Sequence, residues 1–199
     1  AGSSCTSSYG RTVSLNLTEA RARAALVHDV RTRVALDLTD PDWFTVRAAV
    51  SFGCRESGAT TFLELADATD VLVEAGDNTQ TEYDGRRITL RGLGAHNEVT
   101  ITARLPYVID GDGMTTVIDP ADGERYVSAF TAMDIAQRVL PCFDQPDLKT
   151  TFEVSVTAPS HWTVLANGAL TRRDGDTWHF GVTPPISSYL FFVTGGPFV

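Results

Sequence analysis

The four histidines are the first residues to consider as catalytic groups, because imidazole binds zinc and exchanges protons near neutral pH. They lie far apart in the sequence, at His28, His96, His161 and His179. A zinc site of the H-E-x-x-H type needs two histidines at helical spacing with a glutamate between them. No such pair occurs, so we interpret the four as ordinary surface or strand-embedded imidazoles. No catalytic residue and no metal ligand is predicted in this chain.

Other short motifs of enzyme chemistry are absent or incomplete. The sequence has no G-x-S-x-G nucleophile elbow, no P-loop and no G-x-G-x-x-G dinucleotide fingerprint. The acidic stretch 110–113 begins like a calcium loop, but Met114 replaces the third oxygen ligand and Ala121 stands where the bidentate glutamate belongs. Cys142 has Asp144 nearby but no neighbouring histidine to act as its base. We therefore predict a solvated loop and a packed structural cysteine.

One long connection, residues 126–152, stands out by its composition. Pro141 and Pro146 fix their own φ angles and hold the residues before them extended. Arg138, Asp144 and Lys149 can tie this segment down through charge-assisted hydrogen bonds. The composition therefore predicts an ordered connection between strands.

The core of that connection resembles a family signature. Residues 138–149 read R-V-L-P-C-F-D-Q-P-D-L-K, which is similar to the R-x-x-F-P-C-F-D-E-P-x-x-K of the N-terminal domain of aminopeptidase N-type zinc peptidases, the gluzincin aminopeptidases. The residues that match this structural motif are Arg138, Pro141, Cys142, Asp144, Pro146 and Lys149. The resemblance extends over residues 17–199 and implies a saddle-shaped β-sandwich that packs on a separate thermolysin-like catalytic domain. In the family that other domain carries the zinc, the H-E-x-x-H and the G-A-M-E-N loop, so no cofactor is expected in this chain.

The resemblance also implies candidate substrate contacts. In the family a Q-F-E stretch before the proline-rich motif lines the substrate pocket, and its glutamate helps to bind the free α-amino group. The matching residues here are Ala129, Phe130 and Thr131, which lack both polar contacts, so recognition of a peptide N-terminus should be substantially weaker. One extra residue before Arg138 shifts the alignment at Met133 and Asp134, and the Asp134 carboxylate can partly replace the lost charge.

The rest of the sequence predicts the elements that hold these residues. Thr18 can cap a short helix that has Glu19 in its first turn and the helix-forming run 20–26 behind it. Apolar and polar residues then alternate with the period of half-buried strands, and Asp-Gly or Asn-Gly pairs at 84–85, 122–123, 167–168 and 174–175 predict tight turns that need a positive φ. Strands are expected at 30–38, 44–52, 62–65, 71–74, 87–90, 99–105, 125–130, 152–158, 161–165, 177–182 and 189–193. The predicted fold class is all-β, a saddle-like antiparallel β-sandwich of about ten or more strands with one short N-terminal helix.

Composition sets wider limits. The chain has 199 residues, with 16 Lys and Arg against 25 Asp and Glu, and its net charge of −9 argues against a nucleic-acid partner. No apolar run approaches the roughly 20 residues of a membrane helix, so no membrane partner is expected. Three widely spaced cysteines favour a reducing compartment, and we expect a cytoplasmic protein. Residues 1–15 are predicted to be a flexible tail or tag remnant, and residues 16–199 one domain.

Three hypotheses for the function follow. The first is a non-catalytic subunit that docks on a separate catalytic-domain-like polypeptide and helps to shape its substrate site, acting on an amine-bearing biosynthetic intermediate. The second is the N-terminal domain excised from a full-length zinc aminopeptidase. The third is a stand-alone small-molecule binder or biosynthetic enzyme that reuses the concave face of the sandwich.

Overall fold

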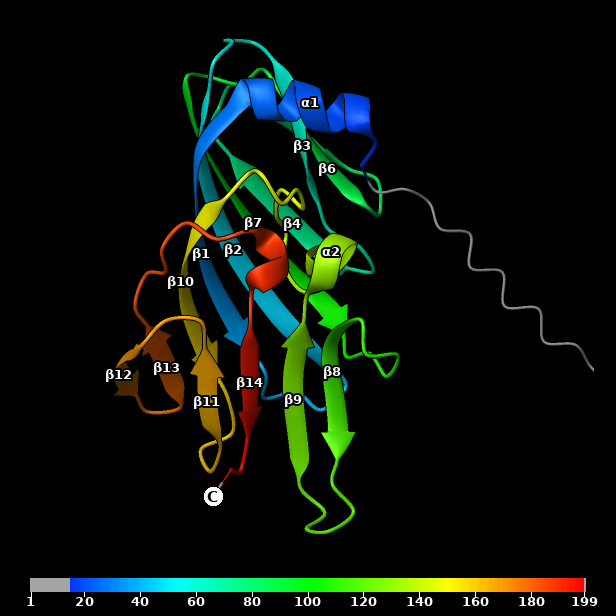
Figure 1. Ribbon diagram of the computed structural model, residues 1–199, viewed down its shortest axis with the longest axis vertical. Coiled ribbons are helices and arrows are strands. Elements are labelled where there is room, and N and C mark those ends of the chain that lie inside the picture. Colours follow the sequence, from blue (N-terminus) through cyan, green and yellow to red (C-terminus); the bar gives the residue numbers. More distant parts are fainter. Residues whose placement is uncertain (1–14, 199) are drawn as a thin grey trace, which may run out of the picture.

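The computed structural model describes residues 15–198, so the predicted tail at 1–15 lies outside the described residues except for Leu15. The described residues form 14 strands in three sheets of seven, four and three strands, with a short helix at the start (Figure 1). The helices are α1 (Leu17–Leu26), α2 (Ala132–Ile135) and the 3-10 turns η1 (Ala136–Arg138) and η2 (Ser188–Leu190). The strands are β1 (Val27–Asp37), β2 (Trp43–Cys54), β3 (Thr60–Glu64), β4 (Thr69–Ala75), β5 (Gln80–Tyr83), β6 (Arg87–Arg91), β7 (His96–Pro106), β8 (Gly113–Ile118), β9 (Arg125–Phe130), β10 (Thr150–Thr157), β11 (Thr163–Ala166), β12 (Leu170–Asp174), β13 (Thr177–Phe180) and β14 (Val193–Gly196). The predicted all-β class with one N-terminal helix is confirmed.

The helix α1 is capped two residues before Thr18, at Asn16. The Asn16 side chain accepts a hydrogen bond from the Glu19 amide at 3.0 Å, and the Glu19 carboxylate accepts one from the Asn16 amide at 3.0 Å. This reciprocal pair is a capping box. The expectation that Thr18 is the cap was therefore wrong, because the Asn16 side-chain oxygen already satisfies a free backbone donor of the first turn.

The seven-stranded sheet has the order β12-β13-β10-β1-β2-β7-β4. Its central pair, β1 and β10, runs in parallel with Val30 opposite Thr150 and Asp37 opposite Thr157. The other pairs of named strands in residues 15–198 are antiparallel, as predicted. The parallel pair departs from the antiparallel prediction because a strand from the N-terminal end of the domain lies beside one that follows the proline-rich segment.

Only one face of the seven-stranded sheet is buried. Along β1 the side chains of Val30, Val34 and Leu36 are buried, whereas Arg31 and Arg33 between them are exposed. The buried face packs against apolar side chains of the two smaller sheets, which lie in front of it in Figure 1. The larger sheet therefore has an inner face in the core and an outer face in solvent.

Some predicted elements differ from the structure. The strand expected at 189–193 was wrong, because η2 covers Ser188–Leu190 and the strand β14 begins only at Val193. The strands β5, β8 and β12 were not predicted; β12, at the edge of its sheet, has no buried residue and so lacks the apolar alternation that marks a strand. Gly85, Gly123 and Gly175 adopt positive φ in their turns, but Gly168 does not. Glycine is required at Gly168 for another reason, since a Cβ there would collide with the carbonyl oxygen of Gly181.

Candidate functional site

The proline-rich segment lies against the edge strand β3 of the three-stranded sheet. Cys142 and Glu64 exchange two backbone hydrogen bonds, of 2.8 and 3.1 Å, which add one bridge to that edge. The Cys142 side chain is buried, and burial raises the pKa of its thiol well above the ordinary range. A buried thiol that holds its proton is a poor nucleophile, which agrees with a structural role for this cysteine.

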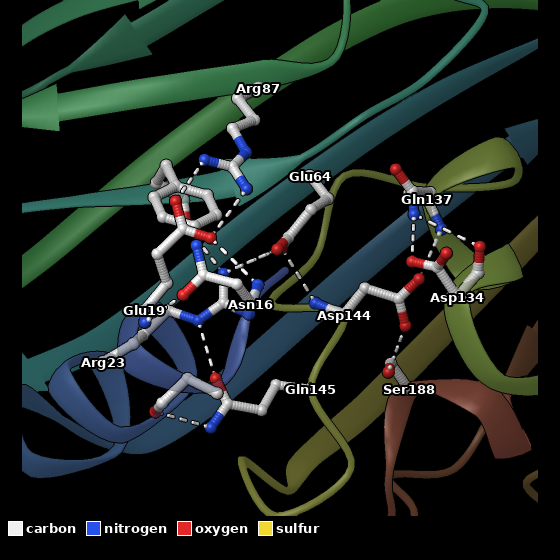
Figure 2. Close-up of polar contacts among 12 residues, drawn as sticks. Asn16, Glu19, Arg23, Glu64, Arg87, Asp134, Gln137, Asp144, Gln145 and Ser188 are labelled. Atoms are coloured by element: carbon white, nitrogen blue, oxygen red, sulfur yellow. Dashed lines mark hydrogen bonds and ion pairs between the residues drawn. The ribbon is translucent and has the colours of Figure 1, made fainter. Parts of the chain in front are cut away.

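A buried ion pair fixes this segment to the helix α1 (Figure 2). Arg23 and Glu64 are 3% and 0% exposed, and one guanidinium nitrogen of Arg23 donates to both oxygens of Glu64 at 2.8 and 2.9 Å. The Arg23 Nε atom also donates to the side-chain oxygen of Gln145 at 2.9 Å, while the guanidinium lies 4.7 Å from the centre of the Phe62 ring. Three segments far apart in the sequence are thus joined at one arginine.

Asp144 extends this polar cluster toward the end of the four-stranded sheet. Its backbone amide donates to Glu64 at 3.0 Å, and its carboxylate accepts from Ser188 Oγ at 2.9 Å and from the Gln137 amide at 3.3 Å. Burial raises the pKa of the Asp144 carboxyl, and the hydrogen bond from Ser188 opposes that shift. The cluster therefore connects the proline-rich segment to η1 and η2.

Arg138 and Lys149, the two basic residues of the predicted motif, lie in different surroundings. Arg138 forms ion pairs with Asp67 at 3.0 Å and with Asp110 at 3.2 Å, and it donates to the Asp112 carbonyl at 2.6 Å. Lys149 is exposed and makes no ion pair with any residue of the described range. The acidic stretch 110–113 is thus held to Arg138 by an ion pair and a hydrogen bond.

The five predicted substrate-contact residues divide into two groups. Ala129 and Thr131 are 3% and 2% exposed, and the Thr131 hydroxyl lies 3.0 Å from the Tyr189 carbonyl oxygen and 2.6 Å from that of Phe191. Phe130, Met133 and Asp134 are exposed. The surface members of the predicted set are therefore the phenylalanine, the methionine and the carboxylate.

Asp134 occupies a special backbone position. Its φ of 68° lies in the left-handed region, which a residue other than glycine adopts uncommonly, and Met133 before it is also non-helical. The Gln137 side-chain amide donates to the Asp134 carboxylate at 2.9 Å and to its carbonyl at 3.2 Å. This kink falls in the stretch where the sequence carries one extra residue, and Gln137 fixes the direction of the Asp134 side chain (Figure 2).

Next to these residues, the outer face of the four-stranded sheet is uncharged. The sheet has the order β11-β14-β9-β8, and a row of cross-strand partners runs across it through Leu165, Thr194, Ser128 and Thr115. Directly paired residues point to the same side of a sheet. Phe130 and Phe192, 56% and 41% exposed, lie beside this row, each two residues along the chain from Ser128 or Thr194. We call these six residues the uncharged face.

Sequence reasoning did not find most of the uncharged face. Leu165, Phe192 and Thr194 come from segments predicted as strands or loops without a functional role. The available signal was the lack of charge at alternate positions of 126–130 and 163–165, in a chain where 21% of residues are charged. The pairing of these segments, which turns separate uncharged positions into one surface, is visible only in the structure.

Within residues 15–198, no group of three or more His, Cys, Asp or Glu side chains is arranged to hold a metal ion. These residues therefore do not fit a zinc site, and we assign no step of chemistry to zinc in this part of the chain. None of the helices in the described range is long and apolar enough to cross a membrane.

Comparison with known proteins decides the family. Residues 77–190 match the family described as the Peptidase M1 N-terminal domain. The chain belongs to this family. The aminopeptidase N of Streptomyces lividans is 35% identical over 192 residues, which are 92% of this chain and 22% of that relative. A probable aminopeptidase 1 of Sulfurisphaera tokodaii is 32% identical over 127 residues, or 61% of this chain and 16% of that protein.

Two solved structures share the fold. Leukotriene A4 hydrolase from Saccharomyces cerevisiae superposes with a TM-score of 0.70 at 18% identity, over 87% of this chain and 29% of that chain. An M1 zinc metallopeptidase of Deinococcus radiodurans gives a TM-score of 0.68 at 18% identity, over 86% of this chain and 42% of that chain. The resemblance to an M1 N-terminal β-domain is thus confirmed, and the chain spans less than half of each of these four proteins.

Proposed function

We propose that this M1 N-terminal domain is a non-catalytic subunit that docks on a separate catalytic-domain-like polypeptide through its uncharged face. The observation that carries the proposal is the row Leu165, Thr194, Ser128 and Thr115, which presents no charge across four strands of an acidic protein. Charged residues are depleted at the centres of protein interfaces, and contiguous exposed apolar surface commonly marks an interaction site. The exposed rings of Phe130 and Phe192 supply the large apolar contacts that such a centre needs.

The proposal places Met133 and Asp134 at the margin of the partner's substrate site. Both are exposed, and Asp134 offers a carboxylate whose direction Gln137 fixes. A carboxylate beside an apolar contact suits a ligand with a primary amine, so an amine-bearing intermediate of a biosynthetic reaction is the substrate class we propose. Zinc, where the reaction uses it, belongs to the catalytic polypeptide.

The proposed location is the cytoplasm. Two cysteines of the described range, Cys54 and Cys142, are free and buried rather than joined in a disulfide. Free buried thiols suit a reducing compartment. Periplasmic or extracellular recovery of the native protein would count against this part of the proposal.

The test is complex formation with an M1-type catalytic polypeptide that carries H-E-x-x-H and comes from the same source. We expect the two chains to co-elute in size-exclusion chromatography and to bind in calorimetry. If this chain stays alone at micromolar concentrations of both, docking on a separate polypeptide is wrong.

The second candidate, an N-terminal domain excised from a full-length zinc aminopeptidase, has specific support. The chain covers 22% of the Streptomyces relative while matching it over 92% of its own length. This candidate predicts a native reading frame that continues past Val199 into an H-E-x-x-H segment, and then the uncharged face packs on a covalently linked domain. Sequencing the reading frame separates the two candidates.

The third candidate is a stand-alone binder or enzyme whose pocket contains Phe130, Met133 and Asp134. It predicts that the isolated chain binds or converts an amine-bearing molecule, and that Asp134→Ala removes this activity. Unchanged activity in Asp134→Ala would eliminate this pocket.

A further inference from the structure

A depression of about 400 Å³ lies on the outer face of the seven-stranded sheet, on the solvent side of the central strands. Two alanines on neighbouring strands, Ala35 of β1 and Ala49 of β2, are among the residues that line it. Arg47 is paired with Ala35 and Arg33 with Ala49, so each arginine stands beside an alanine of the adjacent strand. Directly paired residues share a face of the sheet, and the short alanine side chains leave room between the two arginines.

The guanidinium groups of Arg33 and Arg47 have N–H donors that make no hydrogen bond with the described residues. Arg47 is exposed and makes no ion pair or side-chain hydrogen bond with the described residues. Arg33 uses its Nη2 atom to contact Glu98 at 3.1 Å, which leaves other N–H groups of its planar fork available. Two guanidinium groups flanking one space are the arrangement that binds carboxylate or phosphate oxygens through charge-assisted hydrogen bonds.

The depression lacks the negative charge excess of the whole chain. Three arginines and two glutamates line the depression, although the protein carries a net charge of −9. One of the three, Arg172, is already paired with Asp174 at 3.0 Å, so the free donors are those of Arg33 and Arg47. On the side of β1 away from β2, Ser155 of β10 is the cross-strand partner of Ala35 and of His179 in β13. This pairing adds a hydroxyl and an imidazole to the same face.

We propose that this depression binds a small oxyanion-bearing molecule, with one carboxylate or phosphate group held between Arg33 and Arg47 above Ala35 and Ala49. Glu153 of β10 is the cross-strand partner of Arg33 and has no ion pair in the described range. Its carboxylate can accept a hydrogen bond from an N–H group of the same molecule. The site faces away from the four-stranded sheet, so it does not depend on the proposed docking through the uncharged face.

The test is a titration of the 15N-labelled chain with citrate and, separately, with inorganic phosphate in about 0.15 M sodium chloride, where weak surface attraction is largely screened. We expect saturable shifts of the backbone amides of Ala35, Arg47, Ala49 and Ser155 in the NMR spectrum. Saturation by citrate alone assigns a carboxylate ligand, saturation by phosphate assigns a phosphate ligand, and linear shifts with both overturn the proposal.

Three variants test the geometry. Arg47→Ala should weaken binding about tenfold, because it removes one of two charge-assisted donors. Ala49→Leu should abolish binding without a change of charge, because it fills the space between the arginines. Arg21→Ala, an exposed arginine of α1, is the matched charge control and should bind as the wild type does. Equal affinity in Arg47→Ala and Arg21→Ala, both with well-dispersed spectra, would contradict the site.

Discussion

The outer faces of the four-stranded and the seven-stranded sheet are built by the same alternation of side chains, yet they carry different chemistry. The smaller sheet presents Leu165, Thr194, Ser128 and Thr115 without a charge, whereas the larger sheet presents arginines and glutamates around alanines. Charged residues are depleted at the centres of protein interfaces. This difference is the basis for the proposed docking through the smaller sheet, and it leaves the outer face of the larger sheet to solvent.

Both outer faces rest on the same buried interior. A substitution that disrupts this interior should therefore give the largest loss of stability. Arg23→Ala leaves Glu64 as a buried, uncompensated charge, and we expect a loss of about 3 to 5 kcal/mol in the free energy of unfolding. Urea unfolding followed by fluorescence measures this loss. The double replacement Arg23→Met with Glu64→Leu should recover much of it, while Arg21→Ala should change stability by less than about 0.5 kcal/mol. A loss below about 1 kcal/mol in Arg23→Ala would show that the pair does not hold the segments together.

A charge introduced on each face separates the two surfaces directly. Ser128→Arg places a guanidinium in the uncharged row, and we expect docking on the catalytic polypeptide to weaken by about 2 kcal/mol or more, because that charge must lose its water. Ser51→Arg on the outer face of the seven-stranded sheet is the matched control and should leave docking unchanged. Calorimetry gives both affinities. Equal weakening by the two variants would remove the distinction between the faces.

The residue below the uncharged face should matter for stability rather than docking. Thr131→Val removes a buried hydroxyl that lies within hydrogen-bond distance of two carbonyl oxygens near η2, and we expect a loss of about 1 to 2 kcal/mol. Thr115→Val, on the uncharged face, has no side-chain hydrogen bond to lose within the described residues and should be nearly neutral. Thermal unfolding distinguishes the two; a neutral Thr131→Val would mean that its hydroxyl does not fasten β9 to η2.

The smallest effect concerns the cap of α1, which lies on neither face. Hydrogen bonding from Arg87, and then from the Asn16 amide, lowers the pKa of Glu19. A lowered carboxyl pKa in the folded state adds stability above the unfolded pKa, at about pH 4.3, and this contribution is lost as the pH falls through the folded pKa. Glu19→Gln should therefore cost about 0.5 kcal/mol at neutral pH, a modest figure because the side chain is partly in water. The difference in the free energy of unfolding between Glu19→Gln and the wild type should vanish at about pH 2. A constant difference down to that pH would show that the ionised Glu19 carboxylate does not stabilise the cap.

The inner and outer faces of the long strands could be predicted from the sequence, because their alternation repeats over many residues. Edge strands could not: β12 has five exposed residues, so no apolar pattern marks it. The family motif located the proline-rich segment, but it could not reveal that Arg23 joins it to Glu64 and Gln145, which lie 41 and 122 residues away along the chain. The candidate substrate-contact residues came from the resemblance to the family motif. Only the structure showed that the side chains of Ala129 and Thr131 point inward.

The parallel pairing of β1 and β10 has a consequence for synthesis on the ribosome. The hydroxyls of Thr32 and Thr150 on these strands meet across a sequence separation of 118 residues. β1 can pair with β2 as soon as both have emerged, but its other edge stays open until residues 150–157 follow. Open strand edges recruit foreign strands, and contacts of long sequence separation form slowly. A nascent chain of this domain therefore carries an exposed edge through most of its translation, so slower elongation prolongs the period in which it can aggregate.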